Sequence, residues 1–145
     1  MSWEDIEAIK RLKARYFRLM DTKQWDDFGK LFTEDAVMDM SGELERVGLD
    51  AQAGITHGNQ VIAAMVRESV DVAVTCHHGH MPEIELTSDT TATGIWAMFD
   101  YVDFAGTGPY PGLKGYGHYH ETYEKVDGEW RIASTRLTRL RVDDL

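Results

Sequence analysis

The sequence predicts an α+β domain over residues 1–145, with three amino-terminal helices packed on one face of an antiparallel sheet. In the first half of the chain, apolar residues recur every three or four positions, which is the period of a helix. From Val72 onward the period changes to two, which is the period of a strand. Helices followed by a run of strands are typical of α+β architecture, and 145 residues fit one domain.

The helices are predicted from three apolar stripes. The first ends at Asp21, a short second helix begins at Trp25, and a third covers residues 59–70. Strand-like alternation follows Asp35, and the polar segment 41–56 is predicted to be a loop that covers a cavity. The first stripe consists of Trp3, Ile6, Ile9, Leu12, Tyr16 and Leu19.

Four long strands are predicted from the two-residue period. Tight-turn signals lie at Ser88-Asp89, between the first and second strands, and at Asp127-Gly128, between the third and fourth. A glycine- and proline-rich connection joins the second strand to the third. Strands of this length usually bend or contain bulges. The predicted strands are Val72–Leu86, Thr90–Phe104, Leu113–Val126 and Glu129–Val142.

The composition argues against several kinds of protein. The chain has 15 Lys and Arg against 25 Asp and Glu, and the net charge of −10 disfavours nucleic acid as a partner. No apolar run approaches the roughly 20 residues of a membrane span, and the mixed-charge amino terminus differs from a signal peptide. The single cysteine, Cys76, excludes an intrachain disulfide and a cysteine-based zinc cluster. We therefore expect a cytoplasmic protein without a nucleic-acid or membrane partner.

Five of the six histidines fall in two short segments of the predicted strands. Alternation places His77 on the face opposite His78 and His80. In the second segment it places His118 and His120 on one face and Tyr119 on the other. Each histidine is either a hydrogen-bonded sheet residue or a functional group, and the pattern favours a base on one face and an interface or a metal on the other. The segments are His77-His78-Gly79-His80 and His118-Tyr119-His120.

Two carboxylates lie at positions that favour function. Asp21 ends the first predicted helix, where a cap is the ordinary interpretation, and Asp100 lies within an apolar strand. A charged residue in such a strand is paired, exposed or functional. Arginines on the last strand usually face solvent, although one could point into a cavity; they are Arg136, Arg139 and Arg141.

The order of elements and three motifs resemble the SnoaL-like branch of the NTF2-like superfamily over nearly the whole chain. The motifs are D-x-K-x-W-D from Asp21, a histidine early in the first long strand, and Y-x-x-x-D-G-x-W from Tyr123. The resemblance implies a cone-shaped barrel in which three helices pack on a strongly curved antiparallel sheet. Within the superfamily, the chain is most similar to scytalone dehydratase, bile-acid dehydratase and hexachlorocyclohexane dehydrochlorinase.

The resemblance also implies the site residues. Asp21 and His77 match the Asp–His dyad of these enzymes, Tyr16 matches a cavity tyrosine, and Asp100 matches a second carboxylate. Two further residues are implied to bind substrate, namely Tyr119 and Arg139, with Arg136 as the alternative to Arg139 if a bulge shifts the register.

The chain departs from the dehydratases at two positions. Met40 stands where both have a tyrosine, and Met20 stands where the scytalone enzyme has another, which argues against scytalone as the substrate. A methionine-rich wall would adapt to a bulky apolar or aromatic ligand, or the same residues are ordinary core. The expected wall comprises Met38, Met40, Val61, Met65, Met98 and Tyr101.

These expectations favour a cofactor-independent lyase in which His77 abstracts a proton, Asp21 orients it, Tyr16 and Arg139 stabilise negative charge and Asp100 assists the leaving hydroxyl. Isomerase or cyclase chemistry begins with the same step. A non-catalytic binding module is a second class, and a metal-dependent barrel is a third, because Gly112-x5-His118-x-His120-x3-Glu124 partly matches the metal motif of cupins. We expect no cofactor or metal, a hydrophobic small-molecule partner, and a homo-oligomer, with a trimer favoured over a dimer.

Overall fold

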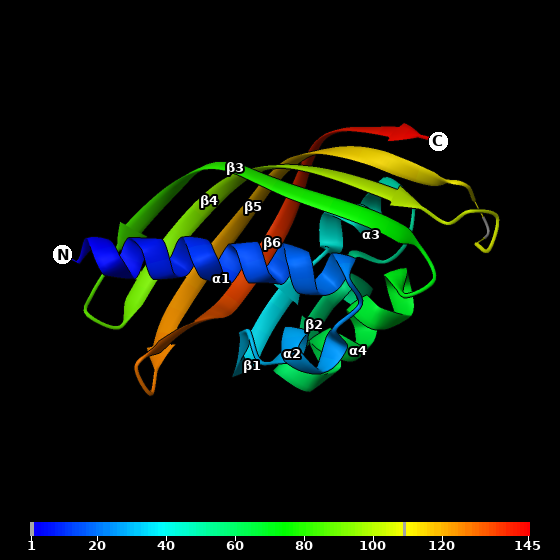
Figure 1. The fold of residues 1–145 in the computed structure, drawn as a ribbon. Coiled ribbons are helices and arrows are strands. Elements are labelled where there is room, and N and C mark those ends of the chain that lie inside the picture. The colour runs from blue at the N-terminus through cyan, green and yellow to red at the C-terminus, as the bar shows by residue number, and fades with distance from the viewer. Residues whose placement is uncertain (1, 109) are drawn as a thin grey trace.

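The computed structural model describes residues 2–108 and 110–145, which form a curved six-stranded sheet with helices on its concave side (Figure 1). The strand order is β2-β1-β6-β5-β4-β3, so β2 and β3 are the edges of an unclosed sheet. The strands are β1 (Phe32–Asp39), β2 (Ile55–His57), β3 (Val74–Leu86), β4 (Thr91–Asp103), β5 (Gly112–Val126) and β6 (Glu129–Asp144). The helices are α1 (Trp3–Asp21), α2 (Trp25–Gly29), α3 (Ser41–Arg46) and α4 (Asn59–Val70), with a 3₁₀ turn, η1 (Ala51–Gly54).

This architecture confirms the predicted α+β class and corrects it in two places. Segment 41–56 is not a plain loop, because it contains α3, η1 and the start of β2. The sheet is also not purely antiparallel, since β1 pairs with β6 in parallel, with Met38 opposite Thr135. A pairing between strands about a hundred residues apart leaves no local signal in the sequence.

Helix α1 lies along the concave side of the sheet and carries the first site residues. The hydroxyl of Ser2 accepts from the backbone N–H of Asp5 at 3.4 Å and caps the helix start. Its apolar stripe is buried against the sheet from Ile9 onward, whereas Trp3 at the first turn remains exposed. The helix ends at Asp21, as the sequence predicts, and Lys23 has a positive φ of 62° that turns the chain toward α2.

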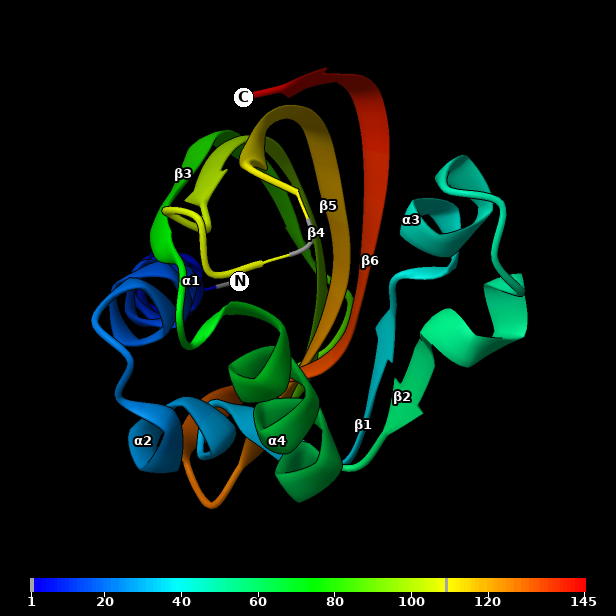
Figure 2. The ribbon, with the colours of Figure 1, turned by 90° about the vertical axis from the view of Figure 1, so that its right-hand side faces the viewer.

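The four long strands bend because their ladders are interrupted by bulges. The register shifts between His80 and Glu83, between Tyr116 and Gly117, and between Thr122 and Tyr123. The turn between β5 and β6 has positive φ at both Asp127 (51°) and Gly128 (79°), which suits the predicted two-residue hairpin. The bent sheet wraps around one side of the molecule, with α1 and α4 on the side of its hollow and α3 beside β6 (Figure 2).

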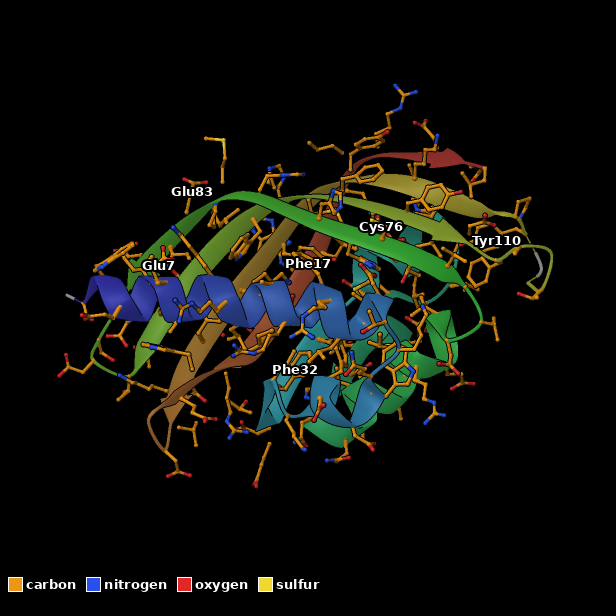
Figure 3. All side chains as sticks on the ribbon, in the orientation of Figure 1. Glu7, Phe17, Phe32, Cys76, Glu83 and Tyr110 are labelled. Atoms are coloured by element: carbon orange, nitrogen blue, oxygen red, sulfur yellow. The ribbon has the colours of Figure 1, made fainter. Side chains whose placement is uncertain are left out.

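Strand alternation divides the side chains between the two faces of the sheet (Figure 3). On the concave face, His77 on β3, Asp100 on β4 and Tyr119 on β5 are buried. The predicted segregation of the histidines is therefore present, since the members other than His77 lie on the convex face: His78, His80, His118 and His120. No helix within the described ranges is long and apolar enough to cross a membrane.

Candidate active site

A cavity of about 210 Å³ lies between the concave face of the sheet and helices α1, α3 and α4. It brings together most of the residues that the sequence predicted for the site, from seven different helices and strands and from the connection after β1. The predicted residues that line it are Tyr16, Met38, Met40, Met65, His77, Asp100, Tyr119 and Arg139. Further walls come from Met20, Val66, Ser69, Val70, Val102, Phe104, Leu113 and Leu137, and from Glu43 and Tyr110 at the open end.

The end of α1 holds the histidine of β3 in a fixed orientation. The carboxylate Oδ1 of Asp21 lies 2.7 Å from Nδ1 of His77, and its Oδ2 accepts from the backbone N–H of His77 at 2.8 Å. The hydroxyl of Thr75 donates to the same Oδ1 at 2.9 Å. A carboxylate only accepts hydrogen bonds, so Nδ1 carries the proton and Nε2 is the basic nitrogen. The predicted contact across 56 residues is therefore present.

Two phenols line the cavity beside this histidine. Tyr16 and Tyr119 are almost fully buried, with ring centroids 6.0 Å apart. Burial raises the pKa of Tyr16 well above its ordinary value, and the negative charge of Glu121 raises it further. Burial likewise raises the pKa of Tyr119, with the neighbouring Tyr16 and Asp100 adding to the effect. Both phenols therefore remain neutral hydrogen-bond donors at physiological pH.

Asp100 and Arg139 form a buried ion pair next to His77. Nη1 of Arg139 donates to Oδ1 of Asp100 at 2.6 Å and Nη2 donates to Oδ2 at 3.0 Å, while Nε donates to Glu43 at 2.8 Å. Burial lowers the pKa of Arg139, but the hydrogen bonds and charges of Asp100 and Glu43 outweigh burial, so the pKa is raised. Oδ2 of Asp100 also lies 3.9 Å from Nε2 of His77. Asp100 is thus held as a carboxylate, close enough to stabilise a protonated imidazole.

The ion pair lies directly over Gly115 on β5, opposite Asp100 in the sheet. A Cβ atom at Gly115 would overlap both the guanidinium of Arg139 and the carboxylate of Asp100. Gly115→Ala is therefore expected to displace the pair and to lower the free energy of unfolding by about 1–3 kcal/mol, the usual cost of overpacking. Urea denaturation measures this change.

Gly42→Ala is the matched control for that measurement. A Cβ at Gly42 would meet only a backbone oxygen at 3.8 Å, which is an ordinary contact, so the free energy of unfolding should not fall. It should rise by up to about 1 kcal/mol, because alanine favours a helix more than glycine does and Gly42 lies in α3. Equal stability of the two variants would show that the space above Gly115 does not constrain the ion pair.

Three residues expected in the wall do not line the cavity. Tyr101 points to the convex side, because its neighbours Asp100 and Val102 point inward and strand side chains alternate. Met98 is buried behind the wall, with its sulfur 3.6 Å from Nη1 of Arg139. Val61 lies on the outer side of α4 and is 57% exposed.

The choice between the two candidate arginines depends on a bulge in β6. Tyr123 pairs with Ile132 but Thr122 pairs with Ser134, so Ala133 is the extra residue, and the inward positions change from even numbers, as at Ile132, to odd numbers, as at Leu137. Arg139 consequently faces the cavity, whereas Arg136 lies opposite His120 on the convex face.

Sequence reasoning missed a buried ion pair beneath the cavity, formed by Lys13 and Glu121 at 2.7 Å. Two signals point to it in the sequence. Lys13 is four residues after Ile9 and three before Tyr16, which places it on the apolar stripe of α1. Glu121 occupies an inward position between Tyr119 and Tyr123 on β5.

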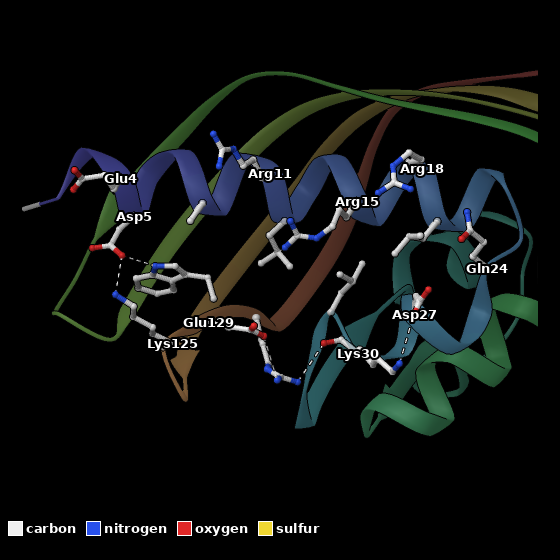
Figure 4. Close-up of a pocket in the computed structure, with 17 residues that line it drawn as sticks. Glu4, Asp5, Arg11, Arg15, Arg18, Gln24, Asp27, Lys30, Lys125 and Glu129 are labelled. Atoms are coloured by element: carbon white, nitrogen blue, oxygen red, sulfur yellow. Dashed lines mark hydrogen bonds and ion pairs between the residues drawn. The ribbon is translucent and has the colours of Figure 1, made fainter.

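A larger hollow of about 750 Å³ lies between α1, α2 and the hairpin of β5 and β6 (Figure 4). None of the predicted site residues lines it. Its charged side chains partly pair with one another, as in Asp5–Lys125 at 3.0 Å and Asp27–Lys30 at 3.3 Å. We therefore place the candidate active site in the smaller cavity, where a base, two neutral donors and an ion pair converge.

The cupin-like spacing does not build a site in this fold. His118 and His120 lie on the convex face of β5, where the strand is part of an open sheet beside helices. Within residues 2–108 and 110–145, no group of three or more His, Cys, Asp and Glu side chains is arranged to hold a metal ion.

Known proteins resemble this chain in sequence and in fold. Residues 1–136 match the family described as SnoaL-like domain. A Gibberella zeae protein named probable cyclase FGR4 is 30% identical over 146 residues, covering 97% of this chain and 94% of that protein. A candidate scytalone dehydratase of Novosphingobium aromaticivorans is similar in structure, with a TM-score of 0.81 at 21% identity over 97% of this chain and 87% of that one. The hexachlorocyclohexane dehydrochlorinase LinA-type3 of Novosphingobium barchaimii is also similar in structure, with a TM-score of 0.79 at 18% identity. The match covers 98% of this chain and 90% of that one. These structures share the NTF2-like fold of this chain.

Proposed function

The chain belongs to the SnoaL-like domain family, and from its cavity we propose that it is a cofactor-independent lyase that removes water from a small, uncharged, cyclic β-hydroxy carbonyl compound. The observation that carries this proposal is the orientation of His77. Nδ1 of His77 is hydrogen-bonded to Asp21, so the basic Nε2 is the ring nitrogen that can contact a substrate in the otherwise largely apolar cavity. A positioned neutral imidazole is suited to general-base catalysis near neutral pH.

In the proposed reaction, Nε2 of His77 removes a proton from the carbon next to the substrate carbonyl. The electron pair moves into the carbonyl, and the oxygen that becomes negative accepts hydrogen bonds from the hydroxyls of Tyr16 and Tyr119. Re-formation of the carbonyl expels the β-hydroxyl, which takes the proton back from the imidazolium and leaves as water. The products are an enone and water, and the histidine returns to its starting state.

The bidentate pair with Arg139 changes the role that the sequence suggested for Asp100. A carboxylate that accepts two hydrogen bonds from a guanidinium favours its ionised form, and an ionised carboxylate has no proton to give to a leaving hydroxyl. We assign that proton to His77, and we assign to Asp100 the stabilisation of the imidazolium from 3.9 Å away.

The charges and the size of the cavity support the substrate class. Arg139 is already bonded to Asp100 and Glu43, so it offers no free positive charge to an anionic substrate. The volume of about 210 Å³ is below the roughly 300–1,000 Å³ of pockets for drug-sized ligands, which favours one or two rings rather than the bulky ligand that the sequence suggested.

A small panel of synthetic substrates tests this proposal. We would incubate the protein with β-hydroxycyclohexanone and β-hydroxytetralone and follow the conjugated product by absorbance. We expect water loss in both to exceed the rate in buffer, and expect no turnover of a β-hydroxy acid of similar size. Faster turnover of the acid than of the ketones would contradict the assignment of a neutral substrate.

Cyclase or isomerase chemistry is the second candidate, because the relative at 30% identity is named as a probable cyclase. It begins with the same removal of a proton by His77 but needs no leaving group. Exchange of the proton next to the carbonyl in deuterated water, followed by NMR, distinguishes the two. Exchange without release of water from any β-hydroxy ketone would favour the second candidate.

We further propose that the convex face is buried in a homo-oligomer, with a trimer favoured over a dimer. Aromatic and aliphatic side chains lie among the histidines of this face: the ring centroids of Phe99 are 5.4 Å from Tyr116 and 6.1 Å from His78. Ile95 and Tyr116 are both more than a third exposed. An apolar cluster of this kind is unusual on the free surface of a monomer.

Assembly is expected to weaken as the pH falls below about 6. Burial, together with the charges of Arg136 and His118, lowers the pKa of His120. Further burial in an interface would lower that pKa again, so the oligomer would bind fewer protons than the free chains and would dissociate as the pH falls. Sedimentation velocity at pH 7.5 and 5.5 measures the change. A monomer at both values would refute the interface, and an oligomer that is stable at both would remove the role of the histidines.

A further inference from the structure

Lys13 is a buried cation that the proposed reaction does not use. Its side chain is 0% exposed on the inner face of α1, behind the wall of the cavity. Removing an ammonium group from water is costly, and burial accordingly lowers the pKa of Lys13 while Glu121 opposes that change. The groups that contact the ammonium of Lys13 must therefore compensate for its loss of hydration.

Glu121 and its neighbours hold Lys13 in one place. Nζ of Lys13 donates to Oε2 of Glu121 at 2.7 Å. The same carboxylate accepts from the hydroxyl of Thr135 at 2.6 Å and from Tyr123 at 2.8 Å, and Tyr123 accepts from Trp96 at 3.0 Å. Three donors on one carboxylate favour its ionised form, so Lys13 faces a fixed negative charge.

Two cavity phenols contact the same ammonium group. Nζ of Lys13 lies 3.8 Å from the ring centroid of Tyr16 and 3.7 Å from that of Tyr119. A cation is attracted to the face of an aromatic ring, and it favours negative charge on that ring. A phenol polarised in this way is a stronger hydrogen-bond donor. Lys13 therefore touches both donors of the proposed site although it does not itself line the cavity.

We propose that Lys13 is a positioning residue for these donors: fixed by Glu121, it holds the rings of Tyr16 and Tyr119 in place and strengthens their hydroxyls as hydrogen-bond donors to a bound carbonyl oxygen. This inference rests on the proposed function for its effect on turnover. Its effect on a bound carbonyl does not depend on any reaction, so the two can be tested separately.

The turnover test uses the double substitution Lys13→Met with Glu121→Gln, which removes both charges, so that no buried charge is left without its partner. With Tyr16 intact, we expect turnover of a confirmed substrate to fall roughly 10-fold. In the Tyr16→Phe background the same double substitution should have a much smaller effect, because one of the two polarised donors is already absent. Glu7→Gln with Lys10→Met removes a partly exposed pair from the same helix and should leave turnover unchanged in both backgrounds.

The binding test uses acetophenone with an isotope-labelled carbonyl carbon, observed by NMR. We expect the carbonyl resonance to move downfield on binding to the unsubstituted protein, and to move less in the double variant and in Tyr16→Phe. Equal losses of turnover in both backgrounds, or the same carbonyl shift with and without Lys13, would overturn the proposal. If the shift depends on Lys13 but His77→Ala retains full turnover, the proposed reaction fails and the role of Lys13 stands.

Discussion

Replacement of His77 by alanine is expected to lower turnover of a confirmed substrate by about 10²–10⁴-fold, the usual cost of losing a general base. The imidazole contributes the nitrogen that removes the proton, and no other neutral base lines the cavity within the described residues. Because His77 faces a cavity, its loss should leave the fold intact. Initial rates measure the first effect and circular dichroism the second.

His78→Ala is the matched control, because the adjacent residue on the same strand points to the convex face. It should retain nearly full turnover. Asp21→Asn should be almost as severe as His77→Ala, since it removes the charge that stabilises the imidazolium and allows the wrong tautomer. Tyr16→Phe should be milder, because it deletes one donor and keeps the ring. Full activity of His77→Ala would refute the proposed base.

The single substitution Lys13→Met is expected to destabilise the protein far more than the double substitution with Glu121→Gln. It leaves the carboxylate of Glu121 buried without its cation, and breaking a buried pair in this way typically costs about 3–5 kcal/mol. That is a large share of a total stability of roughly 5–15 kcal/mol. Urea denaturation should therefore show a much lower midpoint for the single variant, and a midpoint close to the unsubstituted protein for the double variant.

Lys10→Met is the control on the same helix. Its partner Glu7 lies at 3.0 Å, but both side chains keep about a third or more of their surface exposed, so the change in the free energy of unfolding should be below about 1 kcal/mol. If Lys13→Met were as stable as Lys10→Met, Glu121 would have to be neutral in the folded protein, and the ion pair inferred here would be wrong.

Periodicity alone was enough to predict much of the fold and part of the site. The helical stripe of α1 correctly predicted that Tyr16 turns inward, and the two-residue period of β3 correctly separated His77 from His78 and His80. The resemblance to a family indicated which of these two faces is the interior. The convex position of His78 and His80 follows from the same alternation. Tyr101 was placed in the wall against that alternation, and the structure corrects it.

The contacts between distant segments were decided by tertiary structure. Asp21 meets His77 because α1 packs against β3, and the resemblance to a family supplied that pairing where periodicity could not. The extra residue Ala133 places Arg139 rather than Arg136 on the inward side, and a bulge depends on the fit of two strands rather than on either one. The pairing of Lys13 with Glu121 across 108 residues has the same origin. Between the bulges, the sequence specified which side chains share a face, because that depends on local geometry. Where the bulges lie, and which side chains meet, depends on how the elements pack.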